Sequence, residues 1–158
     1  MTSKTKIVKL VKIPNDITEW VSWLNNKKVT KYSNQKLKKH TISSQKKFIQ
    51  NKLNSKTNLI FKIVFNKKFI GVLELGFINR SKKDCEVSYM IGNLKNWGKG
   101  IATKAISLAL VYSKKKLFLK KVYSGIDKKN IASKKVLLKN KFLIVKKTSK
   151  IIYLERTL

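Results

Sequence analysis

Cysteine and proline are nearly absent from this chain of 158 residues, since each occurs once. Cys85 stands alone, so an intramolecular disulfide is impossible and a cluster of metal-binding thiolates is excluded. No histidine adjoins Cys85, which favours a packed strand residue over a nucleophile. We therefore expect neither redox chemistry nor a metal cofactor.

Long apolar runs are also missing. No stretch of about 18 uncharged apolar residues exists, and residues 1–12 alternate lysine with apolar residues, unlike a signal peptide. We expect no membrane span and a cytoplasmic location. Because 42% of the residues are hydrophobic, the chain can bury a core, and its length fits a single domain over residues 1–158.

Acidic residues are scarce, with seven Asp and Glu against 38 Lys and Arg, for a net charge of +31. Such a charge is typical of nucleic-acid-binding modules, and that class stays open as an alternative. However, the lysines are spread over every segment, and Arg80 and Arg156 are the only arginines for reading base edges. A compositional bias explains the charge more simply, so nucleic acid is not a required partner. The electric field should still favour an anionic ligand.

The apolar periodicity changes several times along the chain. Period-2 runs predict strands over residues 4–12, 57–65, 68–78, 85–91, 119–126, 142–146 and 150–155. Helical spacing predicts helices from Pro14 to Leu24, Thr41 to Asn54, Ile101 to Tyr112, and over 130–140. Asn66-Lys67 should form a hairpin turn. The order predicts an α+β fold at the α/β border, with a mixed sheet of about seven strands and helices on both faces.

The strongest chemical signal is the sequence WGKGIA, which we name the phosphate turn (Trp97–Ala102). It follows a predicted strand and opens the longest apolar helix. Gly98 and Gly100 allow a tight turn that exposes backbone N–H groups. The unpaired N–H groups and the positive dipole of the helix start make this turn suitable for a pyrophosphate. A glycine loop without a ligand is the alternative, since two glycines alone are a weak motif.

This turn resembles the acetyl-coenzyme A motif of the GNAT superfamily of N-acetyltransferases, which reads Gln or Arg, two residues, Gly, one residue, then Gly or Ala. Trp97 replaces the Gln or Arg, as in the branch of ribosomal-protein alanine N-acetyltransferases. The resemblance implies a GNAT fold that uses acetyl-coenzyme A. It also implies which residues hold the cofactor. The pyrophosphate would meet Trp97, Gly98, Lys99, Gly100, Ile101, Ala102 and Thr103, and the pantetheine arm would pair with Tyr89, Met90 and Ile91.

A second matching block covers residues 130–142, where Asn130, Ser133, Val136, Lys139 and Phe142 fall on the family spacing. The resemblance implies that Asn130 and Ser133 contact the cofactor, although an asparagine at a helix start is also an ordinary N-cap. The block departs from the family at two positions, with Leu137 in place of a proton-donating tyrosine and Lys141 in place of glycine. The general acid is therefore unassigned.

Acetyl transfer needs a group that removes a proton from the attacking amine. Glu86 resembles the glutamate of the family's E-I-G-Y strand and is the first candidate, and Glu74 on the neighbouring strand is the second. Either residue could instead be a surface strand residue paired with lysine. We expect direct transfer without a covalent intermediate.

The acceptor is suggested by residues 23–45, which resemble GNAT members that acetylate amino groups of nucleotide-linked sugars. This likeness places Trp23, Asn25, Tyr32 and His40 near the acceptor, with an aromatic face for stacking. Trp23 could equally be a core residue of its helix. The alternative acceptor is a protein N-terminus of the ribosomal-protein type. We expect a small-molecule amine substrate and a monomer or homodimer.

Overall fold

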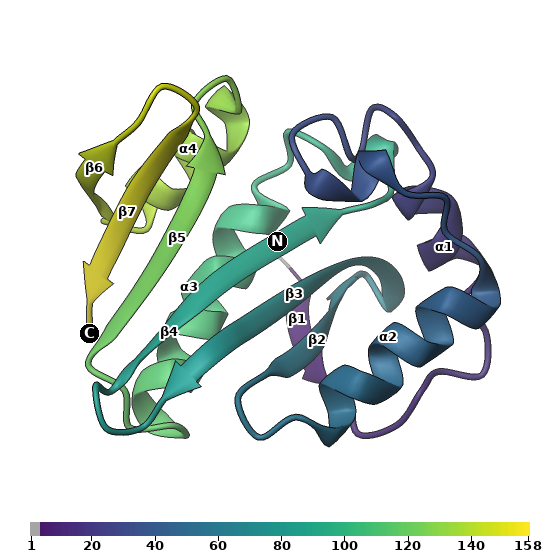
Figure 1. Cartoon of the computed structure of the whole chain (residues 1–158), viewed down its shortest axis with the longest axis horizontal. Helices are drawn as coiled ribbons and strands as arrows, with labels where there is room; N and C mark the ends of the chain where they lie inside the picture. Colours follow the sequence, from purple (N-terminus) through teal and green to yellow (C-terminus); the bar gives the residue numbers. More distant parts are fainter. Residues whose placement is uncertain (1–3) are drawn as a thin grey trace.

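A computed structural model describes residues 4–158. Residues 1–3 of the predicted domain lie outside the described part of the chain. Within this range one mixed sheet of seven strands has the order β1-β2-β3-β4-β5-β7-β6 (Figure 1). Only β4 and β5 pair in parallel. The strands are β1 (Thr5–Lys9), β2 (Leu59–Phe65), β3 (Lys68–Asn79), β4 (Asp84–Ile91), β5 (Lys121–Asp127), β6 (Leu143–Lys147) and β7 (Ile151–Thr157). The predicted α+β fold and its element order are confirmed.

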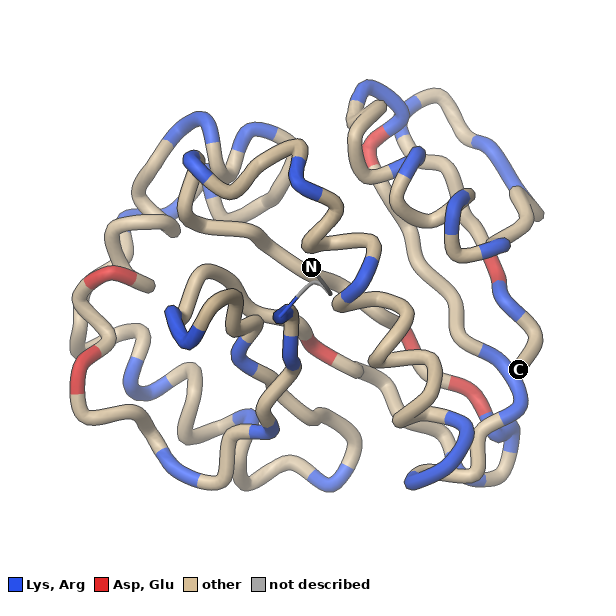
Figure 2. Tube along the Cα trace, turned by 180° about the vertical axis from the view of Figure 1, so that it is seen from behind, with Lys and Arg blue, Asp and Glu red and all other residues tan. Residues whose placement is uncertain are grey.

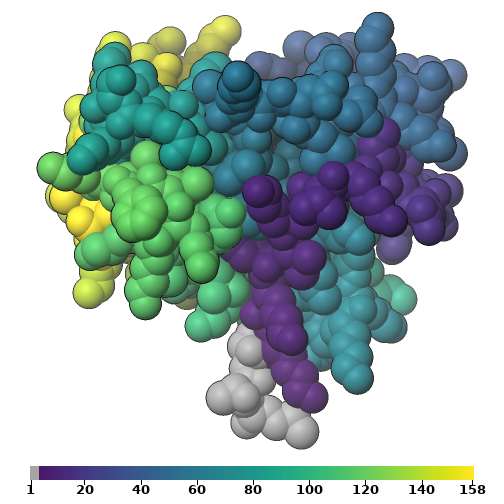
Figure 3. Space-filling view, turned by 90° about the horizontal axis from the view of Figure 1, so that it is seen from below, coloured from purple at the N-terminus to yellow at the C-terminus, as the bar shows by residue number. Residues whose placement is uncertain are grey.

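Helices cover both faces of the sheet, as the sequence predicts (Figure 1). One face carries α1 (Thr18–Leu24) and α2 (Ile42–Asn54), and the other carries α3 (Ile101–Lys115) and α4 (Ile131–Lys139). Two short 3₁₀ helices, η1 (Asn34–Leu37) and η2 (Leu94–Asn96), lie in the connections. Two apolar cores result, and the larger lies under α3 and α4. From below, β1 borders α3, and Ile7 of β1 packs against the larger core (Figure 3).

Strand β4 illustrates how period-2 alternation divides chemistry between the two faces. Cys85 and Val87 are buried in the α3/α4 core, whereas Glu86 and Ser88 point to the α1/α2 face. Burial raises the pKa of the Cys85 thiol to about 11, so the thiol stays protonated. Cys85 is thus a packed strand residue, as the sequence favoured.

The start of α1 differs from the prediction. Pro14 precedes the helix by four residues instead of occupying its first turn. The reason is local, because the side chain of Asp16 accepts a hydrogen bond from the Thr18 N–H at 2.9 Å and so fixes the helix start at Thr18. The predicted hairpin at Asn66-Lys67 is confirmed, and both residues have the positive φ angles (49° and 66°) of a tight two-residue turn.

Lysine and arginine lie on nearly every element and loop (Figure 2). Across the described part of the chain, no helix is long and apolar enough to cross a membrane.

Candidate acetyl-coenzyme A site

The phosphate turn joins β4 to α3 and leaves open space beside its glycines. Gly98 and Gly100 both have a φ of 75°, a left-handed conformation that glycine adopts without strain. A Cβ atom added at either position would meet no atom within 4 Å. Gly100 is the N-cap of α3 and offers no side-chain cap to its first turn. The first N–H groups of α3 therefore face open space, as an anion-binding helix start requires.

Two side chains hold the phosphate turn in place. The Trp97 indole Nε1 donates to the carbonyl oxygen of Ile91, the last residue of β4, at 2.8 Å. The Asn140 Nδ2 donates to the Thr103 carbonyl oxygen in the first turn of α3 at 3.1 Å, and also to the Val136 carbonyl oxygen of α4. Sequence reasoning missed Asn140, because no local pattern connects it to Thr103 across 37 positions.

Strands β4 and β5 pair only at their beginnings, through Asp84–Glu86 and Lys121–Tyr123, and then diverge (Figure 1). The Ser124 hydroxyl donates to the Val87 carbonyl oxygen at 2.9 Å, so the backbone of Val87 faces β5. Backbone groups two residues apart point the same way in a strand, so the N–H and C=O of Tyr89 face the diverging side too. An extended arm could pair with β4 there, where β5 no longer does.

The side chain of Tyr89 reaches from β4 to α4. Its hydroxyl donates to the Ser133 hydroxyl oxygen at 3.1 Å, and burial raises the pKa of Tyr89, which keeps the phenol protonated. Asn130 is the N-cap of α4 and accepts from the Ser133 N–H at 3.1 Å, which confirms its capping role. Leu137, at the family's tyrosine position, lies one turn further along α4 and is buried in the core. Met90 points the other way, into the α1/α2 core.

The two candidate bases are diagonal neighbours on the α1/α2 face. Glu86 lies opposite Gly76 in the β3–β4 register, and Glu74 lies opposite Ser88. Burial raises the pKa of Glu86, the negative charge of Glu74 raises it further, and Lys52 lowers it. Glu74 is itself paired with Lys52, with an Oε1 to Nζ distance of 2.5 Å. Of the two carboxylates, Glu86 is therefore the better proton acceptor.

The expected acceptor residues have different environments. Trp23 is buried in the core, where its ring lies 5.0 Å from that of Phe69, and a Cβ atom at Gly92 would overlap its indole. The stacking face expected of Trp23 is thus covered, which corrects that prediction. The side-chain amide of Asn25 makes two hydrogen bonds to the backbone of His40: it donates to the His40 carbonyl oxygen and accepts from the His40 backbone N–H. Tyr32 keeps an exposed ring, with the Lys31 Nζ 5.2 Å from its centre.

Comparison with known proteins agrees with this geometry. Residues 8–143 match the family model described as "Acetyltransferase (GNAT) domain". No curated protein matches the chain by sequence. Many solved structures share the fold, and three of them, at low sequence identity, serve as examples. The spermidine N-acetyltransferase of Vibrio cholerae with CoA and spermine is 18% identical over 98% of this chain and 95% of that one, with a TM-score of 0.84. The N-acetyltransferase PseH of Campylobacter jejuni is 16% identical over 97% of each chain, with a TM-score of 0.74. RimL, a ribosomal L7/L12 alpha-N-protein acetyltransferase with coenzyme A, is 12% identical over 100% of this chain and 96% of that one, with a TM-score of 0.86.

These identities show the fold alone, whereas the family model spans most of the chain. The predicted membership of the GNAT superfamily is confirmed on this ground. The chain therefore belongs to the GNAT acetyltransferases and is an N-acetyltransferase that uses acetyl-coenzyme A.

Proposed function

We propose that this enzyme acetylates the amino group of a nucleotide-linked amino sugar. The observation that supports this acceptor is the lysine-rich segment, residues 25–41, which has no acidic residue. Six exposed lysines lie on it: Lys27, Lys28, Lys31, Lys36, Lys38 and Lys39. A nucleotide diphosphate would be attracted to such a segment, and the exposed Tyr32 could stack on a base or sugar.

The lysine-rich segment begins beside the cofactor site. Trp23, two residues before it, packs on Gly92, which directly follows β4. The mutual hydrogen bonds of Asn25 and His40 hold the two ends of the segment together, and the His40 Nε2 lies 3.0 Å from the Gln35 carbonyl oxygen. Asn25 and His40 thus act as supports of an acceptor loop, and the lysines and Tyr32 of that loop would contact the acceptor.

For the cofactor, we propose that the backbone N–H groups of the phosphate turn bind the pyrophosphate, helped by the Lys99 side chain and the Thr103 hydroxyl. The backbone groups of Tyr89 and the N–H of Ile91, whose carbonyl oxygen already accepts from Trp97, would pair with the pantetheine arm, and Asn130 and Ser133 would border it from α4. Charge-assisted hydrogen bonds of this kind contribute about 1.5–3 kcal/mol each. The acetyl group of the cofactor would then lie near β4, in the part of the strand that no longer pairs with β5.

For the chemical step, Glu86 would accept the proton of the attacking amine, directly or through water. A carbon–nitrogen bond forms and the carbon–sulfur bond of the thioester breaks. The departing thiolate needs a proton, and the hydroxyl pair of Tyr89 and Ser133, on the opposite face of β4 from Glu86, would supply it. Because Ser133 accepts from Tyr89, its own hydrogen is available to another acceptor.

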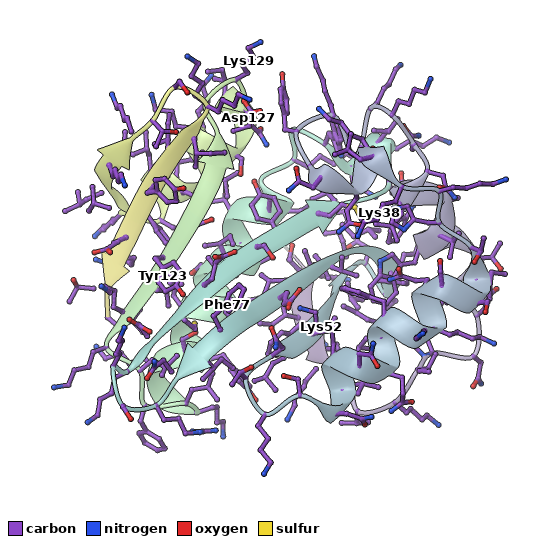
Figure 4. All side chains as sticks on the ribbon, viewed as in Figure 1. Lys38, Lys52, Phe77, Tyr123, Asp127 and Lys129 are labelled. Carbon is purple, nitrogen blue, oxygen red and sulfur yellow. The ribbon has the colours of Figure 1, made fainter. Side chains whose placement is uncertain are left out.

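A protein N-terminus is the second candidate acceptor. Beside Glu86, the open sheet face has a hollow of about 410 Å³, whose lining includes Phe77, Asp84 and Tyr123. Figure 4 shows Phe77 and Tyr123 in front of the sheet, on the side of Lys52. An extended peptide could lie along this face. The structural similarity to the ribosomal-protein enzyme is compatible with this acceptor.

The acceptor can be identified by measuring thiol release with three groups of amines: nucleotide-linked amino sugars, peptides with a free N-terminus and polyamines. We expect turnover with the first group. Exchanging Lys38 and Lys39 together for Ser should then raise KM for the acceptor and leave acetyl-coenzyme A binding unchanged. Exchanging Lys146 and Lys147 of β6, which removes equal charge elsewhere, is the control. Turnover with polyamines alone would contradict the proposal.

Nucleic-acid binding stays an open alternative of another class. Its signature is an affinity that falls steeply with salt for any sequence, by about 0.9 logarithmic units per phosphate contact for each tenfold rise in salt concentration. If the protein binds nucleic acid but the nucleic acid does not change the rate of amine acetylation, the binding is a side effect of the lysine-rich composition.

A further inference from the structure

Lys52 of α2 makes contacts that hold it beside the sheet. Its Nζ donates to Glu74 Oε1 of β3 at 2.5 Å and to Asn58 Oδ1 at 3.4 Å, and it lies 5.4 Å from the centre of the Phe48 ring. The side chains of Lys52 and Glu74 are 27% and 24% exposed, so water screens this pair only in part. We name Lys52, Asn58 and Glu74 the Lys52 network.

The Lys52 network lies directly beside Glu86. Gly76 is opposite Glu86 in the β3–β4 register. A Cβ atom added at Gly76 would lie 3.1 Å from Asn58 Oδ1 and 3.4 Å from Glu74 Oε1. The polar atoms of the network therefore occupy the space that a side chain at position 76 would need. The missing side chain of Gly76 allows Glu74 to approach Glu86 on the same face of the sheet.

Several charged or titratable groups face Glu86 besides the network. Tyr123 of β5 lies opposite Glu86, and Asp84 lies two residues earlier on the same face of β4. Beyond them, Lys121 and Glu155 form an ion pair at 3.3 Å. Burial raises the pKa of Tyr123 most, followed by the charge of Glu86, so this phenol is neutral at physiological pH. Lys52 is the cation that lowers the pKa of Glu86.

We propose that the Lys52 network controls when Glu86 holds a proton, with Glu74 as the charge that favours protonation and Lys52 as the counter-charge that opposes it. The inference rests on the proposed function, in which Glu86 accepts the amine proton. Glu74 is then a positioning residue and not the base. A general base works best when its pKa approaches the operating pH without exceeding it. Two opposing charges beside one carboxylate offer a way to reach that balance in a chain with few acidic residues.

The protonation of Glu86 can be measured without an acceptor. The chain has four glutamates, Glu19, Glu74, Glu86 and Glu155, so labelling glutamate with carbon-13 at the carboxyl gives a spectrum that single Gln variants can assign. We expect Lys52→Met to shift the titration midpoint of Glu86 upward and Glu74→Gln to shift it downward. The signs follow from removing a cation or an anion near a carboxylate.

Matched controls remove the same charge from exposed positions. Lys46→Met on α2 and Glu19→Gln on α1 lie outside the network and are exposed, so they should leave the Glu86 midpoint nearly unchanged. Shifts in Lys52→Met and Glu74→Gln no larger than in these controls, or shifts of the same sign in both, would overturn the proposal. If Lys52→Met does not fold, as judged by circular dichroism, Lys52→Gln removes the charge and keeps a polar side chain.

An activity measurement separates this inference from the proposed function. Once an acceptor is known, the acidic limb of the kcat/KM profile should move in the same direction as the Glu86 midpoint in each variant. Full activity of Glu86→Gln would refute Glu86 as the base and with it the catalytic meaning of the network. If the wild type is active and the acidic limb of its kcat/KM profile does not move in Lys52→Met or Glu74→Gln, the control of Glu86 by the Lys52 network is refuted, while the proposed function stands.

Discussion

Gly100→Val tests whether the phosphate turn binds the cofactor. In the free protein a Cβ atom at position 100 meets no atom within 4 Å, so the substitution meets no obstacle at the Cβ position. It does place a β-branched residue at a φ of 75°, which costs about 1–2 kcal/mol because the Cβ atom approaches the backbone. Small domains are stable by about 5–15 kcal/mol. The variant should therefore fold, with a Tm lower by several degrees.

The effect on acetyl-coenzyme A should be larger. The valine side chain would fill the open space in front of the first N–H groups of α3, where we propose that the pyrophosphate lies. Losing one charge-assisted hydrogen bond costs about 1.5–3 kcal/mol, which corresponds to a Kd about 10–100 times higher. Isothermal titration of the folded variant with acetyl-coenzyme A measures this directly.

A strain control distinguishes the two effects. Lys67 has a φ of 66° in the exposed β2–β3 hairpin, away from the phosphate turn, so Lys67→Val also places a β-branched residue in the left-handed region. It should lower the Tm and leave the Kd unchanged. A folded Gly100→Val protein that binds acetyl-coenzyme A within about twofold of the wild type would refute the pyrophosphate position.

Three further substitutions test Glu86 and the residues that follow α4. Lys141 follows the α4 C-cap Asn140 and has a φ of 61°, at the C′ position that favours glycine. Lys141→Gly should therefore stabilise the fold by about 1 kcal/mol in urea unfolding, and an unchanged midpoint would contradict this. Asn140→Ala should raise the Kd of acetyl-coenzyme A more than it changes kcat, because Asn140 holds Thr103 in the first turn of α3; an equal effect on both would show only a structural role. Glu86→Gln should lower turnover about 100-fold or more with cofactor affinity unchanged. Glu86→Gln should also raise the Tm at pH 7, because the raised pKa of Glu86 means that the fold disfavours its carboxylate form. This gain in Tm should vanish below pH 4.5, the ordinary pKa of a glutamate, where Glu86 is neutral in both the folded and the unfolded protein. A gain that persists at lower pH would have another cause.

Much of this fold is encoded in local sequence patterns. Alternating apolar residues predict the strands, Asn66-Lys67 predicts the hairpin, and the spacing of Gly98 and Gly100 before an apolar helix predicts the phosphate turn. These features depend on residues close in sequence, whose backbone preferences and buried faces are set locally. The start of α1 was misjudged because Pro14 suits a helix start, whereas the side chain of Asp16 decides it.

The contacts between distant elements were decided only by the tertiary structure. The sequence indicates that Trp23 lies on an apolar helix face, but the packing on Gly92 determines that its ring is covered. Likewise, Lys52 meets Glu74 only because α2 packs against β2, the strand next to β3, and Asn140 meets Thr103 only because α4 ends beside the start of α3. Periodicity defines which face of an element is buried, whereas the partner of a polar side chain depends on strand register and helix placement. The sequence therefore determined the cofactor motif, and the tertiary structure decided the surroundings of Glu86.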